Sequence, residues 1–543
     1  MANKAAKAAE QASPRHWAWK IALLIIVLAT AAVRWRLVDV PLERDEGEYA
    51  YAAQLILQGI PPYQHVYNMK LPGIYAAYAV VLALFGQTHS GIHLGLVVIN
   101  AATIVLVCLL TRHLMGDLAG AVAAAAFAVL STSQSVQGVL ANAEHFVILP
   151  AVGGLLILSR AIEKDRLLSL ASSGLLLGVA FLMKQHGGAF AAVGGLYLLS
   201  ESLRKHPRDW KRIVLRCALF ALAVALPLLL TCLLLWIVGV FDNFWFWTVT
   251  YGRAYLGQVP LEQAPTQFMA RASRVVGAAP LIWALAAVGL TAICWERKAR
   301  KHWFFVALLA AFSFLAICPG FYFRPHYFVL TLPAAALLAG VATGAVTNLL
   351  ARTRLAVLQY GVGSGLALIC LATSVISQRQ FLFIQTPTEV ARSTYGLNPF
   401  PESLDIARFV RANTTDSDRI AVIGSEPQIY FYSARRAATG YIYTYPLMEE
   451  HDFALRMQQE MIREIQAADP AALIFVNVWT SWLEGRRSHR LIFEWFDRYR
   501  ERFTLRVLAD IRTTGTRYYQ GAELAKLTRR PQTSVEVYTR ARY

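Results

Sequence analysis

The sequence predicts a polytopic α-helical membrane protein of about eleven transmembrane helices, followed by a soluble α/β domain. First, 56% of the 543 residues are hydrophobic and only 16% are charged, whereas soluble proteins carry about 25% charged residues. Second, the apolar residues form blocks of roughly 17–25 residues, and such a block can cross a ~30 Å hydrocarbon core as a helix. Third, the part of the chain after residue 378 has no such blocks.

The apolar blocks give the order of the elements. We place the spans at residues 18–38, 90–110, 117–132, 145–160, 167–182, 187–202, 214–239, 278–295, 303–319, 327–347 and 355–377. Residues 71–86 are also apolar, but they start around Pro72 and are short, so we expect a short or re-entrant helix there. The first block follows basic residues, as in a signal peptide. Because so many spans follow it, we expect an uncleaved helix.

Basic residues between the spans predict the orientation. If the N-terminus is cytoplasmic, every cytoplasmic loop is basic, as the positive-inside rule requires. These residues are Arg112, Arg160, Lys164, Arg166, Arg204, Lys205, Arg208, Lys211, Arg212, Arg297, Lys298, Arg300, Lys301, Arg352 and Arg354. Topology therefore explains the net charge of +18 better than nucleic-acid binding does. The extracytoplasmic segments are then 39–89, 133–144, 183–186, 240–277, 320–326 and the tail.

The tail, residues 379–543, reads as an extracytoplasmic domain after a transmembrane domain of residues 1–378. Arg419–Gly424 and Ala471–Asn477 have the pattern of buried strands. Helical patterns run from Pro401 to Ala412 and over Leu447–Ala467. Strands that alternate with helices favour an α/β domain. The six cysteines lie in or beside apolar blocks, so we expect no disulfide and no zinc site.

The extracytoplasmic segments gather ionisable and polar side chains. Such groups are costly at a membrane boundary, so each is a functional candidate. They are Asp45, Glu46, Glu48 and Lys70 in the first segment, Asn142, Glu144 and His145 in the second, Lys184, Gln185 and His186 in the third, and Arg324, His326 and Tyr327 in the fifth. Outward-facing cations beside acids suit an anionic headgroup, because Arg and Lys both bind phosphate.

Each group also has a simpler explanation. Asp45 and Glu48 fit a capping box with Asp45 as the cap of a helix over Tyr49–Leu57. Lys184 and Arg324 fit side chains that snorkel to lipid headgroups, and His186 and His326 fit interface histidines without a role. The aromatic segment Phe241–Gly257 fits either an interfacial belt or a stacking surface for a sugar or lipid.

Three stretches together carry a resemblance: Arg44-Asp45-Glu46-Gly47-Glu48-Tyr49, Lys70-Leu71-Pro72 and Phe321–Gly340. They resemble the GT-C superfamily of membrane glycosyltransferases, in particular the bacterial aminoarabinose transferases of lipid A, which are related to protein O-mannosyltransferases. That branch has an Arg-Asp-Glu-x-x-Tyr signature and then Lys-Pro-Pro, so Leu71 is a departure. The resemblance covers about residues 15–350. Many relatives place an aspartate in the second segment, where this chain offers Glu144.

The resemblance implies an enzyme of the bacterial inner membrane that transfers a hexose or pentose, with inversion, from a polyprenyl-phosphate donor to a lipid, glycan or protein acceptor on the outer face. The first segment, 39–89, would be the catalytic loop, with Asp45 as base and Glu46 or Glu144 assisting. Donor phosphate binding falls to Lys70, Lys184, Arg324 and His326, and weaker substrate contacts to Glu48, Tyr49, His186 and Tyr327. No cofactor is required, although a divalent metal held by Asp45 and Glu144 stays open.

Two other classes of function stay open as well. A transporter or lipid flippase would also place charge at the membrane, but it should show repeat symmetry or helices broken in corresponding halves. A noncatalytic scaffold would use its tail to bind cell-wall components, and it would leave the acid and cation groups idle.

Overall fold

The computed structural model describes residues 15–205, 207–350, 356–527 and 529–540. The chain forms two compact units, which are described separately. The first, here called the helical unit, comprises Met1–Leu37, His93–Thr231 and Val259–Ile384. The second, here called the sheet unit, comprises Val38–Ile92, Cys232–Gln258 and Gln385–Tyr543. The predicted first extracytoplasmic segment, 39–89, and residues 385–543 of the tail therefore belong to one compact unit.

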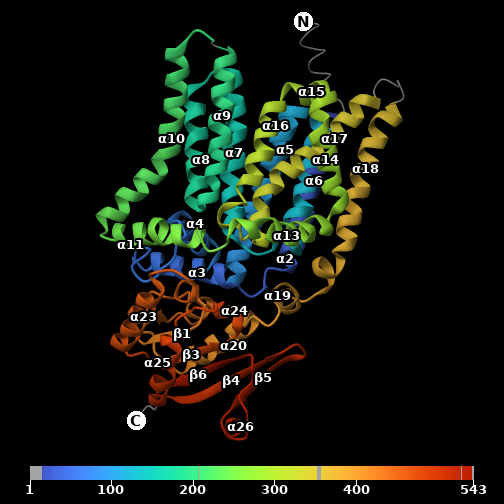
Figure 1. Cartoon of the computed structure of the whole chain (residues 1–543). Coiled ribbons are helices and arrows are strands. Elements are labelled where there is room, and N and C mark those ends of the chain that lie inside the picture. The colour runs from blue at the N-terminus through green and yellow to red at the C-terminus, as the bar shows by residue number, and fades with distance from the viewer. Residues whose placement is uncertain (1–14, 206, 351–355, 528, 541–543) are drawn as a thin grey trace. The chain divides into compact units, whose positions relative to one another are not determined.

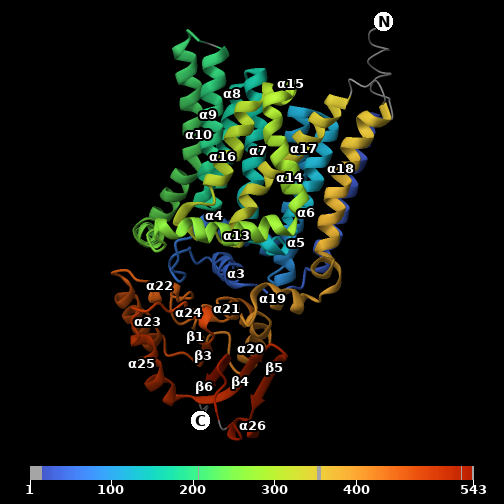
Figure 2. The ribbon, with the colours of Figure 1, turned by 45° about the vertical axis from the view of Figure 1, so that its right-hand side comes forward.

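The helical unit consists of long helices that run side by side in Figures 1 and 2, with α13 lying across them. The helices are α2 (Arg15–Arg36), α5 (His89–Met115), α6 (Asp117–Ser131), α7 (Ala143–Lys164), α8 (Leu167–Met183), α9 (Gly188–Lys205), α10 (Trp210–Ile237), α13 (Ala264–Ala278), α14 (Pro280–Trp295), α15 (Arg297–Lys301), α16 (Trp303–Leu315), α17 (Leu332–Leu350) and α18 (Ala356–Ser377). Helix α7 packs on α8, and α17 packs on α6 and α14.

Small residues allow this close packing. A Cβ atom on Gly289 of α14 would lie 1.9 Å from the carbonyl oxygen of Leu338 on α17. A Cβ on Gly340 would lie 2.4 Å from the carbonyl oxygen of Ala119 on α6. Helices in membranes associate through such small residues, because lipid supplies no hydrophobic driving force between them.

Five of the described helices are long and apolar enough to cross a membrane: Trp17–Arg36, His89–Met115, Ala143–Lys164, Trp210–Ile237 and Pro325–Leu350. A sixth results if Leu261–Ala278 and Pro280–Trp295, bent by 103°, form one broken span. Helices α6, α8 and α16 lie at predicted positions but have only 15, 17 and 13 residues. At 1.5 Å per residue, about 20 residues are needed. The count of eleven therefore stays a prediction.

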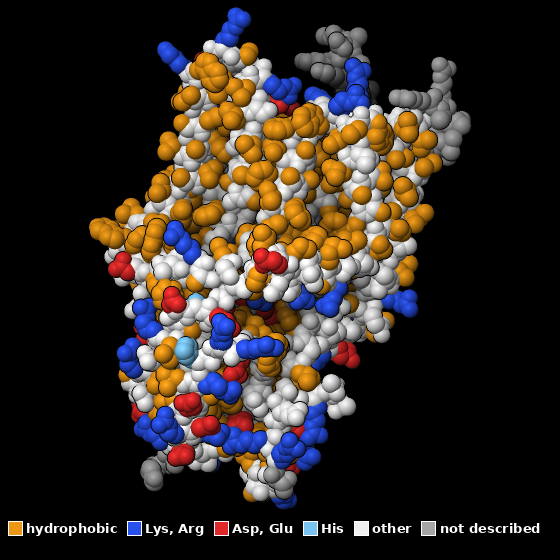
Figure 3. Space-filling view, in the orientation of Figure 1, with side chains coloured by type: hydrophobic (Ala, Val, Ile, Leu, Met, Phe, Trp, Pro, Cys, Tyr) orange, Lys and Arg blue, Asp and Glu red, His pale blue; other side chains and the backbone are white. Residues whose placement is uncertain are grey.

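The outer surface of the helical unit is apolar. Hydrophobic side chains cover the faces of α10, α16 and α18 that Figure 3 shows. Leu222 of α10 and Leu368 of α18 are each about two-thirds exposed. Exposed apolar surface of this extent marks contact with another apolar phase. The chain is therefore a membrane protein, and its sidedness stays a prediction. The basic pair Arg352 and Arg354 lies outside the described residues.

The sheet unit contains a six-stranded sheet of order β2-β1-β3-β6-β4-β5. Its strands are β1 (Arg419–Ile423), β2 (Arg436–Ala437), β3 (Ala472–Asn477), β4 (Thr504–Arg512), β5 (Gly515–Gln520) and β6 (Ser534–Thr539). Strand β1 is parallel to β2 and β3, with Ile420 opposite Ala472, whereas the other pairs are antiparallel. The two predicted strands are thus confirmed, and they are neighbours.

Helices surround the sheet in the same unit. They include α19 (Pro387–Tyr395), α20 (Phe400–Ala412), α21 (Gln428–Ser433), α22 (Tyr445–Met448), α23 (Ala454–Ala468), α24 (Trp479–Trp482), α25 (Leu491–Tyr499) and α26 (Ala522–Ala525). The predicted helix over Leu447–Ala467 is in fact two helices, α22 and α23, because residues 449–453 are not helical. The segment 232–258 contributes α11 (Phe241–Trp245) and α12 (Gly252–Leu256).

The first extracytoplasmic segment adds two helices to the sheet unit, α3 (Arg44–Leu57) and α4 (Pro72–Phe85). Helix α4 has 14 residues, which confirms the expected short helix over residues 71–86. Its first turn contains Pro72, whose missing N–H costs nothing there. Helix α3 packs on α4 and on α21.

Candidate active site

The N-terminus of α3 is closed by a capping box, but not by the predicted one. Glu43 is the N-cap, and its Oε1 accepts from the backbone N–H of Glu46 at 3.1 Å. The Glu46 carboxylate accepts in return from the backbone N–H of Glu43 at 3.2 Å. The assignment of Asp45 and Glu48 to the box is therefore wrong by two residues. Glu46 is tied to the cap, whereas Asp45 is left for other contacts.

Asp45 is paired with Lys70. The Lys70 Nζ lies 3.2 Å from Asp45 Oδ1, and the two side chains are 15% and 12% exposed. The same carboxylate oxygen lies 3.5 Å from the hydroxyl of Tyr443, which follows β2. Lys70 Nζ also lies 5.5 Å from the ring centre of Tyr49, a cation–π distance. A nearly buried carboxylate beside an ammonium group can both accept a proton and face an anionic ligand.

Glu48 lies one turn further along α3 and is fully buried. Its carboxylate accepts from the hydroxyl of Tyr75 at 2.5 Å and from Nδ2 of Asn68 at 2.7 Å. Burial raises the pKa of Glu48 to about 7, because the loss of water outweighs the favourable charge of Lys70 and these two hydrogen bonds. The charge of the Glu48 carboxylate therefore changes near neutral pH.

Tyr49 is a packing residue in this structure. It is 1% exposed, and its ring centre lies 5.3 Å from that of Tyr78 in an edge-on contact and 6.2 Å from that of Tyr75. These tyrosines fix the face of α3 that meets α4. The weaker substrate contact expected of Tyr49 stays a prediction.

The helical unit holds a second polar cluster. Glu144, in the first turn of α7, is fully buried and forms an ion pair with Lys184, the residue that links α8 to the turn Gln185–Gly187. The position at a helix N-terminus also favours a negative charge on Glu144. Lys184 Nζ lies 4.2 Å from the ring centre of Tyr327. Both contacts hold the ammonium group of Lys184 at the ends of α7 and α8.

Two histidines belong to the same cluster, and Arg324 is close to one of them, His326, in the chain. His326 Nδ1 lies 2.9 Å from Oε1 of Gln137, and the ring of His186 meets Tyr327 edge-on at 4.9 Å. Arg324 precedes the 3₁₀ turn Pro325–Thr331, and its guanidinium lies 5.3 Å from the ring centre of Tyr322. The structure thus brings Glu144, Lys184, His186, His326 and Tyr327 together in one unit, by contacts between neighbouring side chains.

The eleven site residues expected from the sequence fall into two groups, one in each unit. Asp45, Glu46, Glu48, Tyr49 and Lys70 lie in the sheet unit, and Glu144, Lys184, His186, Arg324, His326 and Tyr327 lie in the helical unit. Their action on one substrate stays a prediction. Sequence reasoning missed Tyr443, Asn68 and Tyr75. Asn68 could have been found from its place two residues before Lys70, whereas nothing in the pattern marks Tyr443.

No metal centre is evident from the side chains. Across the part of the chain that the structure describes, no group of three or more His, Cys, Asp or Glu is gathered as metal ligands would be. Asp45 has the Lys70 ammonium at 3.2 Å, and Glu144 has that of Lys184. Each carboxylate thus has a positive charge beside it already.

Comparison with known proteins decides the fold. Residues 70–230 match the family model described as dolichyl-phosphate-mannose-protein mannosyltransferase. The chain is similar in structure to ArnT from Cupriavidus metallidurans bound to undecaprenyl phosphate. The similarity covers 97% of this chain and 99% of ArnT, with a TM-score of 0.61 and 16% sequence identity. The chain has a GT-C fold. The expected resemblance to the GT-C superfamily is therefore confirmed at the level of the fold, which the chain shares with the ArnT structures.

A second solved structure agrees with this GT-C fold. It is the archaeal oligosaccharyltransferase AglB from Archaeoglobus fulgidus in complex with an inhibitory peptide and a dolichol-phosphate. The similarity covers 92% of this chain and 74% of AglB, with a TM-score of 0.54 and 12% identity. No curated protein matches the chain in sequence.

Proposed function

We propose that this GT-C protein is a glycosyltransferase that takes its sugar from a polyprenyl-phosphate donor and transfers it to a lipid, glycan or protein acceptor on the outer face of the bacterial inner membrane. The single observation that carries the proposal is the nearly buried Asp45–Lys70 pair, in a chain whose fold is that of an ArnT structure bound to undecaprenyl phosphate. Transfer needs a carboxylate and a cation near each other, and this pair supplies both.

The reaction is a single displacement at the anomeric carbon. Asp45 takes the proton of the acceptor hydroxyl as the bond from its oxygen to that carbon forms. The bond between the anomeric carbon and the phosphate oxygen breaks, and the electron pair leaves with the lipid phosphate. Configuration inverts at the anomeric carbon. Glu144 is the second carboxylate of the proposal, whereas Glu46 is given the structural role that its capping box implies.

Cations stabilise the charge that grows on the departing phosphate. The proposal gives this role to Lys70, Lys184, Arg324 and His326. The loop that leads into α4 positions Lys70 for this role. Contacts with Glu144 and Tyr327 position Lys184. Arg can meet a phosphate with two parallel hydrogen bonds, and Lys meets it as a point charge.

The experiment offers the purified full-length protein a panel of polyprenyl-phosphate sugars and measures the release of polyprenyl phosphate. Release from at least one donor, dependent on the acceptor, supports transfer. A parallel assay in liposomes follows movement of the same donors between leaflets. Movement of a donor without release from any donor would overturn the proposal in favour of a flippase. A variant of Asp39, an acid of the same segment with a 66% exposed side chain, serves as a matched control for Asp45.

A further inference from the structure

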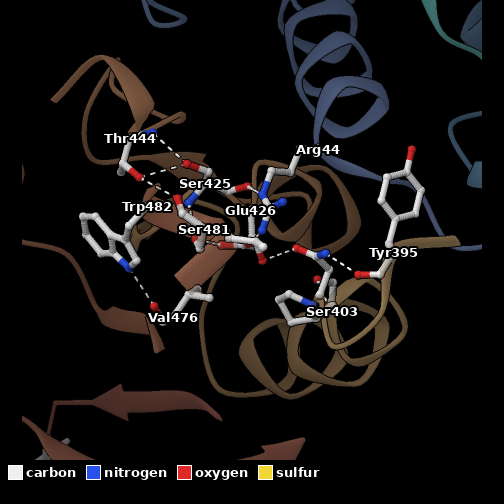
Figure 4. A network of polar contacts seen from close by, with 12 residues as sticks. Arg44, Tyr395, Ser403, Ser425, Glu426, Thr444, Val476, Ser481 and Trp482 are labelled. Carbon is white, nitrogen blue, oxygen red and sulfur yellow. Dashed lines mark hydrogen bonds and ion pairs between the residues drawn. The ribbon is translucent and has the colours of Figure 1, made fainter. Parts of the chain in front are cut away.

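A side chain from α3, that of Arg44, contacts the residues that follow strand β1 of the sheet. Strands β1 and β3 are parallel neighbours, and the chain leaves β1 toward β2 but leaves β3 in the opposite direction. In open α/β sheets, ligands bind in the crevice at the carboxyl ends of two such strands. The corresponding position in this sheet, here called the crevice, is between Ser425–Glu426, which follow β1, and Ser481, which follows β3. Figure 4 shows Arg44, from α3, pointing toward these residues.

The guanidinium of Arg44 is held in this crevice by two groups. Its Nη2 lies 2.7 Å from Oε1 of Glu426, and its Nε donates to the carbonyl oxygen of Ser425 at 2.9 Å. Arg44 is 6% exposed and Glu426 is fully buried. The rings of Phe400 and Tyr445 lie 5.2 and 5.9 Å from the guanidinium carbon. These are the contacts that a bound cationic ligand would make.

The acceptor side of this contact is rigid. Ser481 Oγ donates to Oε2 of Glu426 at 2.5 Å and accepts from the backbone N–H of Ser425 at 2.7 Å. Ser425 Oγ in turn lies 2.8 Å from Oγ1 of Thr444, whose hydroxyl donates to the carbonyl oxygen of Ser481. Both oxygens of Glu426 are therefore paired, and its carboxylate cannot turn away from Arg44 without breaking this network (Figure 4).

Helix α3 meets the same domain at further points. A Cβ atom on Gly47 would lie 2.6 Å from the backbone nitrogen of Gln428 on α21, so only glycine permits this approach. The hydroxyl of Tyr51 accepts from the backbone N–H of Ala437 in β2 at 2.8 Å. The backbone N–H of Leu42 donates to the hydroxyl of Tyr432 at 2.9 Å. The helix is thus docked along two of its turns.

We propose that Arg44 is a positioning residue, and that the domain formed by the tail fixes the orientation of helix α3. In this proposal the domain is not a separate binding module. The inference rests on the proposed function, because it concerns how Asp45 is aimed. Arg44 and Asp45 are consecutive, and neighbouring residues of a helix point about 100° apart. The contacts of Arg44 with Ser425 and Glu426 fix the rotation of α3 about its axis. They thereby also fix the direction in which the Asp45 carboxylate points.

The main experiment measures transfer by full-length Arg44→Lys and Glu426→Gln variants. We expect kcat to fall about 100-fold, the cost of a displacement of about 1 Å at a catalytic group, while the donor KM changes less than about threefold. The matched control is Arg530→Lys, which alters the ion pair between Arg530 and the buried Glu536 of β6 in the same unit. Wild-type kcat in folded Arg44→Lys and Glu426→Gln variants would overturn the inference.

A double variant separates positioning from stability. Buried ion pairs replaced by apolar side chains of similar volume often keep or gain stability. The double variant Arg44→Met with Glu426→Met should therefore unfold at about the wild-type temperature. Its kcat should stay as low as that of the single variants, because the hydrogen bonds from the Arg44 guanidinium to Ser425 and Glu426 are lost. If the double variant recovers both stability and kcat, the pair is only a stabilising contact and the inference is wrong.

A third measurement does not depend on activity. Hydrogen exchange of the full-length Arg44→Lys variant should show faster exchange for the amides of α3, whereas those of β1 and β3 keep their protection. Unchanged protection of α3 would overturn the inference even if no donor is found. The absence of polyprenyl phosphate release by the wild-type protein would instead overturn the proposed function, so the two failures are distinguishable.

Discussion

The Nζ of Lys70 lies 3.2 Å from Oδ1 of Asp45, so the first turn of α3 is in contact with the loop that leads into α4. We predict that Lys70→Met raises the donor Kd by about 10–100-fold, because a hydrogen bond to a charged group contributes roughly 1.5–3 kcal/mol. Titration with a polyprenyl-phosphate sugar measures this. Lys526→Met, at an exposed position of the same unit, is the control, and an equal change in both variants would contradict the role of Lys70.

Arg324 is assigned to the donor phosphate in the helical unit. Arg324→Ala should weaken donor binding, because the bidentate contact with phosphate is lost, and it should also lower kcat, because a positive charge beside the departing phosphate is lost. The measurement is the donor Kd and the kcat of the same preparation. Arg297→Ala, in the basic helix α15, provides the comparison. An unchanged Kd in Arg324→Ala would remove Arg324 from the phosphate site.

The ion pair between Glu144 and Lys184 should matter for stability as well as for activity. Both side chains are less than 10% exposed, and removal of one partner from a buried pair costs about 3–5 kcal/mol. Lys184→Met or Glu144→Gln alone should therefore lower the unfolding temperature clearly, and both together should lower it by less than the sum. Thermal unfolding in detergent measures this.

The control for this pair is Arg204→Gln. Arg204 pairs with Glu201 on α9, and its side chain is 69% exposed, so the loss should be below about 1 kcal/mol. Strictly additive effects of Glu144→Gln and Lys184→Met would show that the two groups do not interact.

Glu48 predicts a pH dependence of stability. Its pKa is raised from 4.5 to about 7 by burial, so between these values the folded state binds more protons than the unfolded state. Stability therefore falls as pH rises from about 4.5 to about 7, by about 3 kcal/mol in total, and then levels off. Glu48→Gln should remove this fall.

The measurement for Glu48 is the unfolding temperature at pH 5 and pH 8. Wild type should lose stability between the two values relative to Glu48→Gln. Glu523→Gln, on the exposed helix α26, should follow the wild type. Parallel curves for wild type and Glu48→Gln would mean that Glu48 stays ionised throughout.

The sequence located the acid and cation groups but not their partners. Asp45 and Lys70 stood out because carboxylates and lysines are rare beside apolar blocks. The contact between Arg44 and Glu426 joins residues 382 positions apart, and no periodicity links such residues. The cap of α3 was misplaced by two residues because its position depends on the extended backbone of Glu43, which a pattern of acids does not reveal.

The prediction of the fold from the sequence was likewise correct for some elements and not for others. Strands β1 and β3 were predicted because Arg419–Ile423 and Ala472–Asn477 are apolar runs. Strands β4 and β5 were missed, since Thr504–Arg512 and Gly515–Gln520 carry charged and polar residues on their exposed positions. The predicted spans over α6 and α8 match the observed helices to within one residue, whereas α16 ends at Leu315, four residues before the predicted end at residue 319.

The most direct test of the account compares wild type with Asp45→Asn in one assay of donor binding and polyprenyl phosphate release. Asn keeps the size of Asp45 but cannot accept the acceptor proton. We predict that Asp45→Asn remains folded and binds the donor within about threefold of wild type, yet releases polyprenyl phosphate at least about 100-fold more slowly. Asp39→Asn should release it at the wild-type rate. Near-normal release by Asp45→Asn would contradict the central role of this carboxylate.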